Sequence, residues 1–292
     1  MTIGGHTRTL GLIGNPVEHT MSPVLQNFLA DRLNIDECYV PFHVKEGFLE
    51  SAVKGAYGLN ILGLNVTVPY KSDVMEYLAD ADDLAKRIGA VNTLVRVEGG
   101  YKGYNTDMPG LYRAMCHDGV DITGKEVVIL GAGGVARAVA MMLLEKEAAG
   151  VIIFNRSVER AVAIADEVNE QAGREFIKAY PMNSYKEVLE DKRYIVVQAT
   201  SVGMSPNTEC AVIEEEDFYR YAEVGYDLIF NPPVTRFMEL CEAAGARSYN
   251  GAKMLAYQGI IAFELWNNLQ VEEDVAKECV DNLLAHIGNG SK

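Results

Sequence analysis

The sequence has too few basic residues to suit a nucleic-acid partner. It holds 26 Lys and Arg against 41 Asp and Glu, a formal net charge of −15. Because nucleic-acid phosphates demand a basic surface, this balance argues against such binding. No apolar run reaches the length of a membrane-spanning helix, and the N-terminal residues lack the apolar core of a signal peptide. We therefore expect a cytoplasmic protein with neither a nucleic-acid nor a membrane partner.

Cysteine is scarce, and the spacing typical of metal ligands is absent. The five cysteines are an odd number without a C-x-x-C pair, and the five histidines show no metal-ligand spacing. The pattern predicts neither a disulfide framework nor a zinc site, so we expect reduced thiols and no metal. Internal repeats, low-complexity tracts and Pro-rich linkers are also missing, so domain boundaries must be inferred from the order of elements.

The most informative feature present is the glycine-rich run G-A-G-G-V-A at residues 131–136. The apolar run before it suits a strand buried on both faces, and the helix formers after it contain no breaker. Gly131 permits the tight turn, Gly133 lets the backbone approach a pyrophosphate, and Ala136 keeps the helix close to the strand. The N-terminus of the helix then faces the anion. This strand–turn–helix pattern predicts a dinucleotide site.

The residues after the next strand indicate which dinucleotide binds. The run at 151–154 ends in Asn155, Arg156 and Ser157, where an NAD site usually places an acidic residue on the ribose 2′-hydroxyl. No acidic residue stands there, and the guanidinium of Arg156 would pair with a 2′-phosphate instead. The sequence therefore predicts NADP(H) as cofactor. The alternative is that Arg156 is only a solvated charge following a strand.

Apolar and helical patterns alternate in two regions of the chain. In the first region, strands are expected at 10–13, 38–44, 62–68 and 91–97, and helices at 23–33, 47–56 and 74–78. In the second region, strands are expected at 126–130, 151–154, 194–198 and 224–230. Two helices, 254–269 and 271–287, end the pattern. Such alternation predicts an α/β protein with mostly parallel sheets, divided near Asp107.

Four polar clusters in the first region stand at expected strand ends. They supply three hydroxyls, two amides, one ammonium and one carboxylate: Thr20, Ser22, Thr67, Asn65, Asn92, Lys71 and Asp107. This inventory suits a polyhydroxylated acid, whose alcohols the hydroxyls and amides would hold while Lys71 and Asp107 move a proton. Singly, each residue has an ordinary structural interpretation: Ser22 begins a helix, and Lys71 is a surface lysine.

The ordered motifs resemble the shikimate/quinate dehydrogenase family from about residue 10 to residue 266. They are G-N-P-V-E-H-T-M-S-P, N-V-T-V-P-Y-K, G-A-V-N-T, N-T-D, G-A-G-G-V-A-R-A, N-R-S, A-T-S-V-G-M and G-A-K-M-L-A-Y-Q-G. The resemblance implies NADPH-dependent, reversible reduction of 3-dehydroshikimate to shikimate, on the route through chorismate to aromatic amino acids.

The resemblance also implies an α/β fold of two domains with the active site in the cleft between them. An N-terminal α/β substrate domain would span residues 1–106 and be completed by the C-terminal helices, 251–292. A Rossmann-type NADP-binding domain would span residues 107–250. The protein is expected to be a monomer or a homodimer.

Matched residue by residue, the resemblance assigns Lys71 and Asp107 to catalysis. The other substrate-binding positions it implies are Thr20, Ser22, Thr67, Asn92, Phe230 and Gln258, with Asp107 also among them. The cofactor-binding positions it implies are Gly131, Ala132, Gly133, Gly134, Val135, Asn155, Arg156, Leu228 and Gly251.

Three positions depart from the family pattern. Thr20 replaces the usual serine and keeps its hydroxyl. Lys253 stands where many members have glycine, and its side chain is expected to point to solvent if the backbone there makes the contact near the nicotinamide. Phe230 replaces a tyrosine whose hydroxyl reaches the substrate, so this chain lacks that donor. Two alternatives therefore stay open: a quinate or dual quinate/shikimate dehydrogenase, and a non-catalytic NADP-binding sensor.

Overall fold

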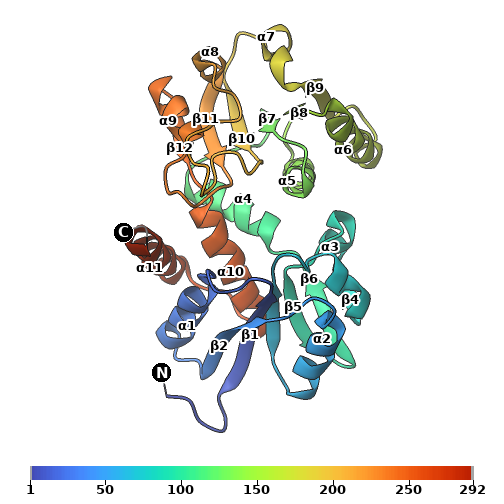
Figure 1. Ribbon diagram of the computed structural model, residues 1–292, viewed down its shortest axis with the longest axis vertical. Helices are drawn as coiled ribbons and strands as arrows, with labels where there is room; N and C mark the ends of the chain where they lie inside the picture. Colours follow the sequence, from blue (N-terminus) through green and yellow to red (C-terminus); the bar gives the residue numbers. More distant parts are fainter. Residues whose placement is uncertain (1, 291–292) are drawn as a thin grey trace. The chain divides into compact units, whose positions relative to one another are not determined.

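The chain forms two compact α/β units, described here from a computed structural model that covers residues 2–290 (Figure 1). Unit 1 contains the residues up to Leu111 together with Leu255–Gly290, and unit 2 contains Tyr112–Met254. Each unit is built on one six-stranded sheet. The division falls inside two helices, α4 (Asp107–His117) and α10 (Ala252–Asn267), so each of them contributes residues to both units.

Unit 1 has a mixed sheet in the strand order β2-β1-β3-β5-β6-β4. Its strands are β1 (Arg8–Gly14), β2 (Glu37–His43), β3 (Gly63–Val66), β4 (Asp80–Ala81), β5 (Thr93–Val97) and β6 (Gly100–Tyr104). Its helices, besides parts of α4 and α10, are α1 (Ser22–Arg32), α2 (Leu49–Gly58), the 3₁₀ helix η1 (Asp73–Tyr77), α3 (Asp83–Ile88) and α11 (Glu273–Gly290).

The two faces of this sheet carry separate apolar clusters because side chains alternate along each strand. Leu10 and Leu12 of β1 pack on one face with Trp266 of α10. Ile13 packs on the other face, in the cluster that contains Val53 of α2. The Trp266 indole also donates to the carbonyl of Leu94 at 2.9 Å. The C-terminal helix α10 thereby covers the N-terminal sheet, as Figure 1 shows within unit 1.

Unit 2 has a wholly parallel sheet in the strand order β12-β11-β10-β7-β8-β9. Its strands are β7 (Glu126–Leu130), β8 (Gly150–Asn155), β9 (Ile177–Pro181), β10 (Tyr194–Gln198), β11 (Ala222–Asp227) and β12 (Arg247–Tyr249). Its helices are α5 (Gly134–Glu145), α6 (Val158–Ala172), η2 (Met182–Ser184), α7 (Tyr185–Val188), α8 (Glu216–Tyr219) and α9 (Arg236–Ala243).

A buried carboxylate fastens the carboxyl ends of the central strands of unit 2. Asp227 is wholly buried at the end of β11 and accepts from the Thr235 hydroxyl at 2.6 Å and the Ile229 N–H at 2.9 Å. Gln198, which ends β10, donates to it at 3.3 Å. Burial raises the pKa of Asp227 to about 6, although the three donors act in the opposite direction. The loop after β11 is thus fixed to its sheet by polar contacts.

The predicted α/β class is confirmed, and the expected strands appear with shifted ends. The expectation of mostly parallel sheets is confirmed, because eight of the ten strand pairings among residues 2–290 are parallel; the two exceptions lie in unit 1, where β5 pairs antiparallel with both β3 and β6. A two-residue turn containing Gly99 (φ +82°) joins β5 to β6, and so short a connection can only join antiparallel strands. The strand expected at 224–230 ends at Asp227, which leaves Phe230 in the following loop.

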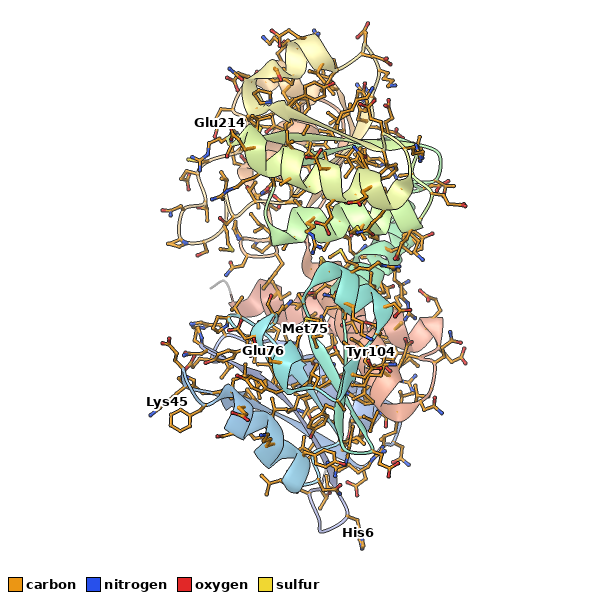
Figure 2. All side chains as sticks on the ribbon, turned by 90° about the vertical axis from the view of Figure 1, so that its right-hand side faces the viewer. His6, Lys45, Met75, Glu76, Tyr104 and Glu214 are labelled. Atoms are coloured by element: carbon orange, nitrogen blue, oxygen red, sulfur yellow. The ribbon has the colours of Figure 1, made fainter. Side chains whose placement is uncertain are left out.

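Polar and charged side chains project from both units (Figure 2). Figure 2 labels Met75 and Glu76 of η1 and Tyr104 of β6, which belong to unit 1, and Glu214, which belongs to unit 2. No helix within residues 2–290 is both long and apolar enough to cross a bilayer. The same residues contain no group of three or more His, Cys, Asp or Glu side chains placed to hold a metal ion.

Candidate functional site

An ion pair between Lys71 and Asp107 forms the centre of the polar site in unit 1. Lys71 lies in the loop after β3, and Asp107 is the first residue of α4. The ammonium donates to Asp107 Oδ2 at 2.6 Å, with the two side chains 33% and 21% exposed. The pair is therefore desolvated in part yet open to a small molecule, which suits a group that must exchange a proton.

The second oxygen of the same carboxylate is held by an amide. Asn92 lies just before β5 and is 3% exposed, and its Nδ2 donates to Asp107 Oδ1 at 2.9 Å. Asn92 Nδ2 also lies 3.5 Å from the carbonyl oxygen of the Gln258 side chain on α10. Four residues from three distant parts of the sequence, Lys71, Asn92, Asp107 and Gln258, are thus brought together within unit 1.

Two hydroxyls gather where α1 begins. Thr20 donates to Ser22 Oγ at 3.2 Å, and the N–H of Ser22 donates back to Thr20 Oγ1 at 3.3 Å. The N–H of Val24 donates to the carbonyl of Met21 at 3.1 Å, and Pro23 has no N–H. The dipole of this helix end, together with the two hydroxyls, therefore favours an anion here. A pocket in unit 1 brings Ser22 and Gln258 to one surface, with Met21, Leu25, Gln26, Leu255, Gly259 and Leu283 as its other lining residues.

Thr67 directly follows β3 and is half-buried. Its N–H donates to the carbonyl of Ile13 at 3.0 Å, and its carbonyl accepts from Tyr70 at 3.0 Å. These backbone bonds fix the start of the loop that carries Lys71. The Thr67 hydroxyl has no hydrogen bond among residues 2–290, so it is available to a ligand.

In unit 2 the glycine-rich turn has the geometry that a phosphate-binding turn requires. Gly131 has a φ of +111°, and a Cβ there would lie 2.6 Å from Thr200, so only glycine fits. Gly133 precedes α5, and Gly134 begins it. A Cβ at either of these two would meet nothing within 4 Å. Ala132 and Val135 are partly exposed, so backbone N–H groups at the start of α5 are accessible to an anion.

The next strand end, after β8, presents positive charge without a local partner. The Asn155 amide donates to the carbonyl of Ser157 at 2.8 Å and shapes the turn into α6. Arg156 and Arg160 are exposed, and neither guanidinium has a hydrogen bond or ion pair within the described part of the chain. The Ser157 hydroxyl donates to Glu159 at 2.8 Å. Two uncommitted guanidiniums thus stand where a ribose phosphate was expected.

Leu228 and Gly251 are neighbours in unit 2. A Cβ at Gly251 would lie 2.3 Å from the carbonyl oxygen of Leu228, and the Gly251 N–H donates to Ile229 at 2.9 Å. Because glycine allows this approach, the loop after β11 lies against the start of α10. Phe230, in the same loop, is 36% exposed.

The expectation that Lys253 points to solvent is wrong. Its ammonium pairs with Asp118, whose side chain is 1% exposed, while that of Lys253 is 25% exposed. Tyr226 Oη donates to the other oxygen of Asp118 at 3.2 Å, and Tyr249 Oη donates to its carbonyl at 3.1 Å. A buried carboxylate needs a countercharge, and Lys253 supplies it.

Three residues, two in the polar site of unit 1 and one in unit 2, were not singled out from the sequence. Thr93 and Thr106 are buried beside Asn92 and contact its side-chain oxygen, and Arg160 is the second free guanidinium after β8. Both threonines belong to the motifs G-A-V-N-T and N-T-D, so the signal was present. The motif alone does not reveal which of its members contacts the others.

A dinucleotide-binding unit with a phosphate-binding turn, together with a lysine–carboxylate pair among hydroxyls and amides, defines a nicotinamide-dependent oxidoreductase that acts on an alcohol. Comparison with known protein families identifies the family within this class of oxidoreductases. Residues 12–94 match the family description "Shikimate dehydrogenase substrate binding domain", and residues 115–220 match "Shikimate / quinate 5-dehydrogenase". The chain belongs to the shikimate dehydrogenase family.

Relatives of known function support this assignment over nearly the whole chain. A shikimate dehydrogenase (NADP(+)) of Methanopyrus kandleri is 40% identical over 284 residues, covering 96% of this chain and 97% of its own. A crystal structure of a shikimate dehydrogenase in complex with NADP+ is 35% identical, with a TM-score of 0.85 over 97% of this chain and 98% of its own.

A second solved structure is similar to this chain, with nearly the same TM-score. It is a shikimate 5-dehydrogenase of Listeria monocytogenes in complex with shikimate and NAD. It is 31% identical, with a TM-score of 0.86 over 95% of this chain and 98% of its own. The predicted family and the predicted α/β architecture are therefore confirmed.

The Lys253–Asp118 pair yields a test of stability. We expect Lys253→Ala to lower the free energy of unfolding by about 2–4 kcal/mol, because it leaves a buried carboxylate without its countercharge. The figure lies slightly below that for a fully buried pair because Lys253 is partly exposed. The measurement is urea unfolding followed by circular dichroism.

Lys186→Ala is the matched control, because Lys186 pairs with Asp217 in the same unit but both side chains are exposed, 58% and 46%. Such surface pairs contribute about 0–1 kcal/mol. Equal and small losses in the two variants would show that Lys253 does not compensate a buried charge.

Proposed function

We propose that this protein catalyses the NADP-dependent, reversible reduction of 3-dehydroshikimate to shikimate. The observation that carries the proposal is the Lys71–Asp107 pair, 2.6 Å apart and partly open, next to the amides of Asn92 and Gln258 in the same unit. A polyhydroxylated carboxylic acid is complementary to such a set of groups. The relatives described above are named as enzymes of this activity.

In this proposal each end of the substrate has its own partners. Thr20 and Ser22, at the N-terminus of α1, bind the carboxylate of the substrate through their hydroxyls. Thr67, Asn92 and Gln258 bind its hydroxyls. The carboxylate site and the proton-transfer site both draw on unit 1, since Ser22 and Gln258 line one pocket and Gln258 lies beside Asn92.

Lys71 moves the proton. Oxidation of the substrate alcohol starts from the neutral amine of Lys71, whose Nζ takes the hydroxyl proton and becomes the ammonium. In the reverse direction the ammonium returns that proton to the carbonyl oxygen. Asp107 keeps the ammonium in place and stabilises the positive charge that forms on it, because Oδ2 accepts directly from Nζ. Asn92 holds the carboxylate from its other oxygen.

The residues of unit 2 fit NADP, which exchanges a hydride with the substrate carbon when it is bound. Ala132, Gly133, Gly134 and Val135 would offer backbone N–H groups to the pyrophosphate at the start of α5, and Gly131, whose own N–H donates to the carbonyl of Phe154, would form the tight turn before them. Asn155 shapes the turn in which Arg156 receives the 2′-phosphate. Leu228 and Gly251 would contact the cofactor where their backbones approach each other.

The alternatives differ in substrate or in class. A quinate dehydrogenase is not favoured, because the most similar relatives described above are named for shikimate. A non-catalytic sensor is not favoured either, because Lys71 and Asp107 are both present and paired.

The direct test is an initial-rate assay of the purified protein that follows absorbance of the reduced nicotinamide. Shikimate and quinate are each offered with NADP and with NAD. We expect the highest kcat/KM with shikimate and NADP. A higher value with quinate would establish the alternative substrate, and no turnover of either acid with either cofactor would refute the proposal.

The proton-transfer role predicts that Lys71→Ala lowers kcat by about 10²–10⁴-fold, the usual loss for a general acid–base. Substrate binding should weaken far less, because the hydroxyl and amide contacts remain. Lys86→Ala, which removes another paired lysine of unit 1, is the control and should keep normal kcat. A folded Lys71→Ala variant with kcat near that of the wild type would remove Lys71 from the mechanism.

The cofactor role predicts that Arg156→Ala raises KM for NADP and leaves KM for NAD nearly unchanged, because only the 2′-phosphate contact is lost. A charge-assisted hydrogen bond of this kind is worth roughly 1.5–3 kcal/mol, or about ten- to a hundredfold. Arg174→Ala, at an exposed arginine elsewhere in unit 2, should alter neither value. An equal loss with both cofactors would assign Arg156 a structural role.

The absent tyrosine hydroxyl predicts that Phe230→Tyr lowers KM for shikimate with little change in kcat. A contact that stabilises the bound substrate and the transition state equally lowers KM and leaves kcat unchanged. Phe230 is 36% exposed, so a hydroxyl can be added without displacing core atoms. Unchanged KM for both shikimate and quinate would mean that residue 230 does not face the substrate.

A further inference from the structure

Behind the Lys71–Asp107 pair lies a buried chain of hydrogen bonds that the proposed mechanism does not use. We propose that Tyr39, Asn65, Thr93 and Asn92 form a one-way series of donors, here named the donor chain, that ends on Asp107 and positions its carboxylate. Thr93 and Tyr39 are thereby positioning residues for the reaction. This inference rests on the function proposed above.

The orientation of Asn92 follows from a backbone group. The N–H of Thr106 lies 2.8 Å from Asn92 Oδ1, and an N–H can only donate. The side-chain oxygen of Asn92 must therefore face Thr106, which turns Nδ2 toward Asp107 Oδ1 at 2.9 Å. The reverse orientation would place the amide nitrogen against an N–H and the amide oxygen against a carboxylate.

The orientation of Asn65 is determined in the same manner. Its Nδ2 lies 3.1 Å from the backbone carbonyl of Asn92, which can only accept. Its Oδ1 therefore faces Tyr39 Oη at 2.7 Å, so the phenol is the donor there. The orientations of the Asn92 and Asn65 amides thus follow from two backbone groups alone. No hydroxyl proton has to be placed in order to deduce them.

Thr93 connects the two amides. Its Oγ1 accepts from Asn65 Nδ2 at 3.1 Å, and its own proton has two acceptors within reach, the Thr106 hydroxyl at 3.3 Å and Asn92 Oδ1 at 3.1 Å. The donor chain takes the shorter contact, which together with the Thr106 N–H gives two donors to Asn92 Oδ1. The Thr106 hydroxyl lies 3.1 Å from the same oxygen and has a second acceptor in Gln258 Oε1 at 3.5 Å.

All the donors therefore point one way, from Tyr39 through Asn65, Thr93 and Asn92 to Asp107. Each of the four donor residues before Asp107 is at most 5% exposed. In so dry a setting each hydrogen bond polarises the next and strengthens it. The carboxylate at the end of the chain gains a firmer donor on Oδ1, while Oδ2 stays with Lys71.

The donor chain also begins, at Tyr39, beside the residues proposed to bind the substrate carboxylate. Burial raises the pKa of Tyr39, and a hydrogen bond from Ser22 partly opposes that rise. Tyr39 is thus a neutral donor at all physiological pH values.

Paired substitutions at two positions test the proposal. Thr93→Val keeps the volume and removes the hydroxyl, and Thr93→Ser keeps the hydroxyl. We expect Thr93→Val to lower kcat by about two- to tenfold, the worth of one neutral hydrogen bond, and Thr93→Ser to restore it. KM for shikimate should change less than kcat, because no substrate contact is removed.

Tyr39→Phe should lower kcat in the same way, and Tyr101→Phe is its matched control. Tyr101 is an equally buried tyrosine of the same sheet, but its hydroxyl donates to the backbone carbonyl of Ile61 at 2.8 Å. A purely structural effect would appear in both variants as a lowered unfolding temperature. Only the donor chain predicts that kcat falls in Tyr39→Phe and not in Tyr101→Phe.

A spectroscopic measurement separates this inference from the proposed function. In isotope-labelled protein, the side-chain amide signals of Asn92 should shift in Thr93→Val and return toward the wild-type position in Thr93→Ser, whether or not shikimate is turned over. Unchanged kcat and unchanged Asn92 signals in Thr93→Val would overturn the donor chain. A wild type inactive toward shikimate, with the Asn92 signals shifting as described, would overturn the proposed function alone.

Discussion

The polar site of unit 1 depends on the direction of one amide, that of Asn92. Its oxygen is committed to the backbone N–H of Thr106, so its nitrogen must donate to Asp107. Because Thr106 and Asp107 are consecutive, the start of α4 both orients the amide and supplies the carboxylate that the amide holds. The lysine then pairs with the remaining carboxylate oxygen. The backbone path from β6 into α4 is thus the scaffold of the site.

The candidate cofactor site of unit 2 depends on close contacts between backbone segments more than on the orientation of side chains. Gly131 has a backbone conformation that other residues rarely adopt, and Gly251 lies against the carbonyl of Leu228. Both places follow a strand of the parallel sheet, where α/β proteins bind their ligands. Asp227 fixes the end of β11, so the loop that carries Leu228 and Phe230 begins from a defined point.

Much of this could be predicted from the sequence, for identifiable reasons. The apolar run and glycines at 126–136 indicate a strand, a turn and a helix because each has a local signature, and the structure contains β7 and α5 there. The antiparallel pairing of β5 was missed because pairing direction depends on a two-residue turn that composition barely reveals. The partner of Lys253 could not be predicted, since Asp118 is 135 residues away in the chain and only the fold makes them neighbours.

The charge of the molecule limits how its proposed ligands can be held. With a net charge of −15, the protein repels anions at long range, yet shikimate and NADP are both anionic. At physiological ionic strength such repulsion is screened beyond about 8 Å. Binding of an anionic ligand therefore depends on the charged groups that contact it directly. The structure supplies them locally: Arg156 and Arg160 have no internal partner, and the N-termini of α1 and α5 lack side-chain caps. Elsewhere basic groups are largely committed to acidic neighbours, as at Arg137–Glu167 and Lys192–Glu126. Arg156 and Arg160 thus place positive charge where the 2′-phosphate is proposed to bind, and this placement offsets the unfavourable overall charge at that point.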